Sequence, residues 1–157
     1  MIQSTHDAAQ TCAVKAINRM QTMRNWLIGY YIVEFEQHGK DRAEYGSQLL
    51  KKLEERVNRK GLNVTLFKNA RNFYLLYPQM EDNFVFLNVP LSNCEGIPKS
   101  PTVLDQLKTS GKLIIAKLSF SHIVEIMAVD DSLARYFYEQ ECIKCTWSVR
   151  ELRRQIS

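Results

Sequence analysis

The strongest constraint on the fold is an uninterrupted stretch near the N-terminus. Residues 5–37 contain no proline and a single glycine, Gly29. Because apolar side chains recur near helical spacing, the stretch predicts one long helix within residues 1–39, bent at Gly29 or straight. A helix that long either packs along a whole domain or is completed by a partner, as a dimerisation element would be. The recurring residues are Ala13, Ile17, Met20, Leu27, Tyr30 and Tyr31.

Residues 44–78 predict two further helices joined by a short turn. Gly61 lies just past the first helix, where a residue in the left-handed conformation is expected. Thr65 is the expected N-cap of the second helix, and Pro78 ends it. Two helices joined by a glycine turn follow the plan of a helix-turn-helix. The side chains expected to face the core are Leu49, Leu50, Leu53 and Val57 of the first helix and Phe67, Ala70, Phe73, Tyr74 and Tyr77 of the second.

Residues 79–117 differ in character, because they contain Pro90, Pro98 and Pro101. The segments Asn83–Val89 and Lys112–Lys117 are β-prone, so a short hairpin or wing within residues 83–117 is one interpretation. A short helix over Val103–Lys108 would lie between them.

Helical patterns return over residues 118–157. Ser119 or Ser121 can begin a helix that runs to Ala128, and Asp130 or Asp131 one that runs to about Lys144. Ser148 and Glu151 fit a capping box for the last helix. We therefore predict a mainly α fold, with residues 1–157 forming a single domain. The second helix of this region, which runs to about Lys144, is expected to bury Leu133, Phe137 and Ile143.

Composition fits a globular protein whose positive charge lies in its first half. The 157 residues are 45% hydrophobic and carry a net charge of +4. Residues 1–77 hold 12 Lys and Arg against 7 Asp and Glu, whereas residues 78–157 hold 9 against 10. No signal peptide or bilayer-spanning run is visible, and four scattered cysteines do not form a disulfide framework. We expect a reduced, cytoplasmic protein without a membrane partner.

The charge pattern suggests a nucleic-acid surface on the second helix of residues 44–78. Between Glu55 and Glu81 there is no acidic residue. At 100° per residue, one face of the helix gathers hydroxyl, amide and basic side chains, which can contact phosphates and base edges. The alternative is an ordinary amphipathic hairpin with a solvated basic face. The predicted DNA-binding residues are Arg59, Lys60, Thr65, Lys68, Asn69, Arg71 and Asn72, and the footprint would extend to Arg150, Arg153 and Arg154.

Candidates for catalysis or metal binding are sparse. The pair Cys142-x-x-Cys145 lacks the second pair of ligands that a structural zinc site uses. His122 and Glu125 are three residues apart, which more often gives a hydrogen bond than a site. Glu34, Glu36 and His38 are close in sequence, but no other group converges on them. We therefore predict no cofactor, no metal and no enzyme activity for this chain alone.

Several segments resemble the N-terminal domain of the bacterial YhcG-like proteins. They are NWLIGYYIVEFEQHGKDRAEYGSQLLKKL (Asn25–Leu53), RNFYLLYP (Arg71–Pro78), LSFSHIVEIM (Leu118–Met127) and FYEQECIKCTWSVRELRRQI (Phe137–Ile156). The resemblance implies a helix-turn-helix-type DNA-binding domain that precedes a nuclease domain of the PD-(D/E)XK type, encoded near restriction-modification systems. These residues contain no such nuclease domain, and Phe120 replaces the tryptophan usual in the family.

The leading hypothesis is therefore a domain that recognises duplex DNA and directs a nuclease linked to restriction-modification or defence. The alternative is a protein–protein interaction module, in which the long helix forms a dimer or docks on a restriction-modification subunit. A third hypothesis is a regulator that binds structured RNA.

Overall fold

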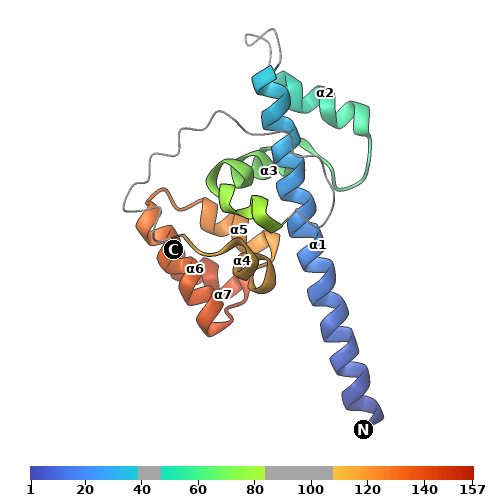
Figure 1. Ribbon diagram of the computed structural model, residues 1–157, viewed down its shortest axis with the longest axis vertical. Coiled ribbons are helices and arrows are strands. Elements are labelled where there is room, and N and C mark those ends of the chain that lie inside the picture. The colour runs from blue at the N-terminus through green and yellow to red at the C-terminus, as the bar shows by residue number, and fades with distance from the viewer. Residues whose placement is uncertain (39–46, 84–107) are drawn as a thin grey trace. The chain divides into compact units, whose positions relative to one another are not determined.

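The computed structural model describes residues 1–38, 47–83 and 108–157 (Figure 1). These residues contain seven α-helices and one 3-10 helix and no strand, which confirms the mainly α fold class. The chain divides into two compact units, Met1–Leu76 and Tyr77–Ser157. That residues 1–157 form a single domain stays a prediction, and each compact unit is described by itself.

The first unit holds three helices, with α1 the longest. Helix α1 spans Ile2–His38, α2 spans Ser47–Val57 and α3 spans Val64–Leu76. Figure 1 shows α2 and α3 beside the C-terminal half of α1. The long helix predicted for residues 1–39 is confirmed, and it continues through Gly29.

Helices α1 and α3 pack closely because Gly29 has no side chain. A Cβ atom at this position would lie 2.0 Å from the carbonyl oxygen of Ala70. Around this contact, Trp26 packs edge-on against Tyr74, with ring centroids 5.1 Å apart. Phe67 and Phe73 complete the buried face of α3. The inward face predicted for residues 67–77 is therefore confirmed.

A smaller apolar cluster joins α2 to this pair. Its buried members are Ile32 of α1, Leu50 of α2 and Phe67 of α3. Leu53 and Leu62 pack against them from α2 and from the following connection. The cluster fixes α2 against the same end of α1 that α3 contacts.

The second unit is built from one 3-10 helix and four short α-helices. They are η1 (Pro78–Asn83), α4 (Gly111–Lys117), α5 (Phe120–Met127), α6 (Ser132–Cys145) and α7 (Val149–Ile156). Helix α4 packs on η1, and α5 packs on α6 and α7. The core side chains that are fully shielded from solvent are Met80, Ile114, Ile123, Ile126 and Leu152.

Two predictions about the second unit are wrong. The β-prone segment Lys112–Lys117 is helical, because its apolar residues face a core with helical rather than alternating spacing: Ile114 and Leu118 are both buried. Leu133 and Phe137 of α6 are 57% and 55% exposed, whereas Ile143 is half-buried. The rest of the proposed wing over 84–107, and the helix over 103–107, lie outside the described residues.

The helix starts in this unit follow the predicted capping chemistry. Ser119 begins α5, and Asp131 begins α6 by accepting hydrogen bonds from the Leu133 and Ala134 amides. The capping box of α7 is confirmed: Ser148 N–H donates to Glu151 at 2.7 Å, and the Glu151 amide donates to Ser148 Oγ at 3.3 Å.

Candidate nucleic-acid interface

Helix α3 presents a polar face to solvent, opposite its aromatic core face. Thr65, Lys68 and Asn72 are exposed on it. Asn69 and Arg71 are half-buried at its edges. The five predicted residues of α3 therefore lie on one side of the helix.

The N-terminus of α3 is capped by Asn63. Its side-chain Oδ1 accepts a hydrogen bond from the Leu66 amide at 2.8 Å. The prediction that Thr65 caps this helix is wrong, because the helix already starts at Val64 and Thr65 lies in its first turn. Its hydroxyl is thus on the exposed face and not engaged as an N-cap.

A tight turn places Arg59 and Lys60 directly before α3. Asn58 leaves α2 in the left-handed region with φ 39°, and Gly61 follows with φ 87°. The Leu62 amide donates to the Arg59 carbonyl at 3.0 Å, so Gly61 is the third residue of a four-residue turn. The left-handed conformation predicted for Gly61 is confirmed, but Asn58 rather than Gly61 ends the helix. Arg59 and Lys60 are both exposed at this turn.

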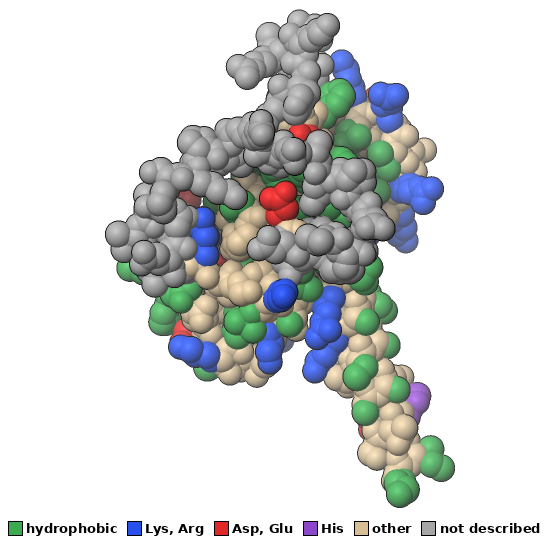
Figure 2. Space-filling model, viewed as in Figure 1, with side chains coloured by type: hydrophobic (Ala, Val, Ile, Leu, Met, Phe, Trp, Pro, Cys, Tyr) green, Lys and Arg blue, Asp and Glu red, His purple; other side chains and the backbone are tan. Residues whose placement is uncertain are grey.

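Basic side chains also lie on α2, which the sequence analysis left out of the site. Lys51, Lys52 and Arg56 are exposed, with Glu54 and Glu55 between them. Figure 2 shows Lys and Arg side chains gathered over α2. The sequence signal was present for Arg56, which begins the run without acidic residues that continues through α3, but not for Lys51 and Lys52. The first unit thus combines basic groups from α2, from the turn and from α3.

Helix α7 carries the second predicted basic surface. Arg150, Arg153 and Arg154 are all exposed in the second unit. Arg153 holds Glu125 of α5 through two hydrogen bonds, Nη2 to Oε1 at 2.5 Å and Nε to Oε2 at 3.2 Å. These bonds keep the pKa of Glu125 below its usual range. Arg153 is therefore the member of this surface whose charge is locally balanced.

A buried polar cluster in the second unit escaped the sequence analysis. The Glu139 carboxyl of α6 accepts from the Tyr77 hydroxyl at 2.5 Å and from the Thr109 hydroxyl at 2.7 Å. Gln140 donates to the same Thr109 hydroxyl at 2.9 Å. Burial raises the pKa of Glu139 above its usual range, against the effect of these two hydrogen bonds. Its partners lie 62 and 30 residues away in sequence, so no local pattern indicated the cluster.

His122 and the Cys142-x-x-Cys145 pair lie in the second unit. His122 Nδ1 lies 2.7 Å from Ser119 Oγ, and its Nε2 lies 2.9 Å from the carbonyl oxygen of Trp147. Cys142 is buried, which raises the pKa of its thiol to about 11, whereas Cys145 is exposed. Over residues 1–38, 47–83 and 108–157, no three His, Cys, Asp or Glu side chains converge so as to hold a metal ion.

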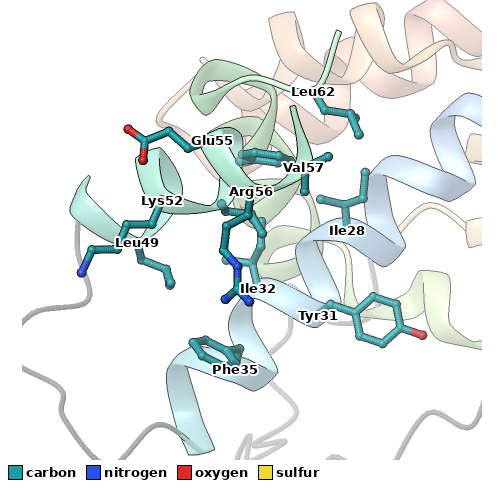
Figure 3. A pocket seen from close by; sticks show the side chains of 12 residues that line it. Ile28, Tyr31, Ile32, Phe35, Leu49, Lys52, Glu55, Arg56, Val57 and Leu62 are labelled. Carbon is teal, nitrogen blue, oxygen red and sulfur yellow. The ribbon is translucent and has the colours of Figure 1, made fainter. Parts of the chain in front are cut away.

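The first unit also contains an apolar groove, which the sequence analysis did not predict. It has a volume of about 670 Å³ and lies between the C-terminal half of α1, helix α2 and the start of α3. Figure 3 shows Ile28, Tyr31 and Phe35 along its α1 side, with Arg56 reaching across from α2.

In the described parts of the chain, no helix combines the length and apolar content needed to cross a bilayer.

These features define a helical protein whose first unit exposes a basic helix, preceded by a basic turn and packed on a long supporting helix. Residues 1–157 match the DUF1016 N-terminal domain family, and the chain belongs to that family. Among curated proteins, the chain is 35% identical over 159 aligned residues to "Putative nuclease YhcG" of Escherichia coli (strain K12). The alignment covers 96% of this chain and 41% of that relative, so the chain spans about two fifths of the relative's length. No solved structure matches the chain.

Proposed function

We propose that this chain is a duplex-DNA-binding domain that acts in the cytoplasm and directs a YhcG-like nuclease to its substrate. The observation that carries the proposal is the solvent face of α3. It exposes Thr65, Lys68 and Asn72 directly after the basic turn of Arg59 and Lys60. The similarity to a protein named as a nuclease supports a nucleic acid as the ligand.

The proposed contacts follow from side-chain chemistry. Arg59, Lys60, Lys68 and Arg71 would neutralise phosphates, which supplies most of the sequence-independent affinity for DNA. Asn69 and Asn72 would approach base edges, where a carboxamide can pair with adenine through two hydrogen bonds. Helix α7 of the second unit would supply further phosphate contacts of its own through Arg150, Arg154 and the balanced Arg153. A link to restriction-modification or defence belongs to the same proposal and rests on the resemblance to the YhcG-like proteins.

The test removes two of the proposed phosphate contacts together. We expect the double variant Lys68→Ala, Arg71→Ala to bind a labelled duplex more weakly than the unaltered chain does. Each lost contact should reduce the slope of log K against log salt concentration by about 0.9, or about 1.8 for both. Fluorescence anisotropy at several NaCl concentrations measures both quantities.

A matched control removes the same charge elsewhere. Lys112 and Lys117 are exposed on α4, which lies in the second unit and outside the proposed footprint. The double variant Lys112→Ala, Lys117→Ala should bind as the unaltered chain does. If both double variants lose affinity and slope equally, the contacts assigned to α3 are wrong. A preference for structured RNA over duplex DNA in the same assay would favour the RNA-binding hypothesis.

A second candidate function is an interaction module, and the exposed side chains of α1 favour it. Ile17 and Met20 are 56% and 58% exposed in the first half of the helix. Apolar groups so placed are typical of a surface that a protein partner covers. Such a partner would be a second copy of the chain or a restriction-modification subunit. This function is compatible with DNA binding, because α3 uses a different helix surface.

A further inference from the structure

Helix α1 has two apolar faces, and only one of them belongs to the core. Trp26, Tyr30 and Val33 of the first face are buried in the first unit. At 100° per residue, a second row lies on the other side of the helix and is apolar along its length except at Arg24. We call this row the outer stripe; it consists of Ala9, Ala13, Ile17, Met20, Leu27, Tyr31 and Phe35.

The outer stripe is exposed along the helix except at Leu27, which is half-buried. Ile17, Met20, Tyr31 and Phe35 are between 55% and 58% exposed. In residues 1–21, every side chain except half-buried Asn18 is exposed, and the continuation of the core face there is polar. Figure 2 shows hydrophobic side chains spaced along this half of α1. The first half of the helix therefore has its apolar side turned away from the core face, where the first unit cannot bury it.

The outer stripe leads directly into the groove of the first unit. Tyr31 and Phe35 belong to both, and Leu49 and Leu53 of α2 line the other side. Figure 3 shows Leu49 and Phe35 facing the same space from the two helices. The groove thus widens the stripe at the C-terminal half of α1 into a concave apolar surface.

We propose that a second copy of the chain covers this surface, with the two α1 helices running antiparallel. The N-terminal half of each helix lies along the stripe and into the groove of the other copy. This inference rests on the second candidate function and names its partner; it does not depend on DNA binding.

The graded size of the stripe residues selects the antiparallel orientation. Alanines occupy the start of the stripe, aliphatic side chains its middle and aromatic ones its end. A two-fold axis at the level of Thr22 sets Ala9 opposite Phe35, Ala13 opposite Tyr31 and Ile17 opposite Leu27 in a single register. Alanine then meets an aromatic ring at two levels, and Ile17 meets the similar-sized Leu27 at the third, as close packing allows.

A parallel pair would fit poorly. It would place Tyr31 against Tyr31, Phe35 against Phe35 and Ala13 against Ala13, so the helix separation would have to change along the pair. It would also set two Arg24 side chains at the same level. In the antiparallel register Arg24 meets Met20, and its guanidinium already turns aside to Asn25 Oδ1, with Nη2 at 2.9 Å.

The surface is large enough for a specific dimer. Tyr31 and Phe35 are each about half exposed, which leaves on the order of 100 Å² apiece to bury. Seven stripe positions on two chains bring the total to roughly 1,000 Å², and the groove adds to it, which approaches the range of specific interfaces. Antiparallel helices also bring opposite ends of their dipoles together.

Sedimentation equilibrium of the full chain without DNA tests the proposal. We expect a dimer at micromolar concentration and, for Ile17→Glu, a dissociation constant at least about 100-fold higher, because two carboxylates would be buried against Leu27. Val14→Glu is the matched control: Val14 is 57% exposed on the same helix but lies off the stripe. It should leave the dimer intact. Far-UV circular dichroism checks that both variants keep their helix content.

A spin label on the exposed Cys12 tests the orientation, with Cys94 and Cys145 changed to Ser. At a rise of about 1.5 Å per residue, the antiparallel register separates the two labels by roughly 30 Å, whereas a parallel pair brings them within roughly 15 Å. Three results would each overturn the proposal: a chain that is still monomeric at about 100 times the micromolar concentration, equal effects of Ile17→Glu and Val14→Glu, or a label separation within roughly 15 Å. DNA affinity is measured separately, so a monomer that binds DNA refutes only this inference.

Discussion

At the scale of single residues, the least expected feature is the carboxyl group of Glu139. It is 6% exposed and connects α6 to Tyr77 and to Thr109, which precede η1 and α4. A buried carboxylate is tolerated when its oxygens accept hydrogen bonds, and here both oxygens do. Burial of Tyr77 also raises the pKa of its hydroxyl, and the neighbouring Glu139 carboxylate raises it further. The cluster therefore ties three segments of the second unit together.

The raised pKa of Glu139 predicts a specific pH dependence of stability. A group whose pKa is higher in the folded than in the unfolded chain stabilises the fold fully below its unfolded pKa, here about 4.5. That contribution is lost as pH rises through the folded pKa. We therefore expect the stability of the unaltered chain relative to Glu139→Gln to fall as pH rises from 4.5. Denaturant unfolding of both proteins at a series of pH values measures this difference.

Glu141→Gln is the control for this comparison, since it removes a carboxyl from the same helix without touching the cluster. The fall in relative stability that is expected for Glu139→Gln should not appear when Glu141→Gln takes its place. A Glu139→Gln difference that is constant or that grows with pH would contradict the assignment.

At the scale of helices, the decisive contact is the close approach of α3 to Gly29. Glycine in the middle of a helix is normally unfavourable by about 1 kcal/mol relative to alanine. Here an added methyl group would meet the Ala70 carbonyl oxygen at 2.0 Å and Tyr74 Cβ at 3.0 Å. The two helices would have to separate, which is a cost of overpacking that outweighs the gain in helix propensity.

We accordingly expect Gly29→Ala to destabilise the first unit by about 3 kcal/mol, against the sign that helix propensity alone predicts. Thermal or denaturant unfolding measures the change. Gly61→Ala provides the comparison, because nothing lies within 4 Å of its Cβ position and only its positive φ is unfavourable. It should cost about 1 kcal/mol. An unchanged or raised stability of Gly29→Ala would show that α1 and α3 do not pack as described.

The helices show where sequence reasoning succeeded and where it failed. Periodicity and caps predicted α1, the inward face of α3 and the start of α7, because these signals are local. The N-cap of α3 was predicted at Thr65 instead of Asn63. Both residue types are good N-caps, and the sequence does not show at which residue the first helical turn begins. Leu133 and Phe137 were predicted to face the core, but the buried residues of α6 are Glu139 and Cys142. A pattern of apolar residues cannot predict that a hydrogen-bonded glutamate is buried.

In the candidate site, too, some features could be predicted from the sequence and others could not. Its residues on α3 were predicted from the absence of acidic residues and from helical geometry, and the structure places Thr65, Lys68 and Asn72 on the solvent face. The ion pair of Arg153 with Glu125 and the groove beside α2 could not be predicted, because both depend on how separate helices pack against one another.

At the scale of the whole molecule, the chain combines a basic surface on α3 with a long helix whose outer stripe is exposed. The two features lie in one unit but on different helices, so the proposed DNA binding and the proposed self-association can be tested separately by mutation. The second unit adds the basic surface of α7. Membership of the DUF1016 N-terminal domain family, and similarity to part of a longer relative, fit a targeting role.

The most direct test of the DNA-binding proposal is the salt dependence of duplex binding by the unaltered chain. If Arg59, Lys60, Lys68 and Arg71 each neutralise a phosphate, the slope of log K against log salt concentration should be about −3.6 or steeper. Anisotropy titrations of a labelled duplex between about 50 and 200 mM NaCl cover the range in which such a slope is evident. Tight binding at low salt with this slope is the predicted result. No binding at the lowest salt concentration, or a slope near zero, would contradict it.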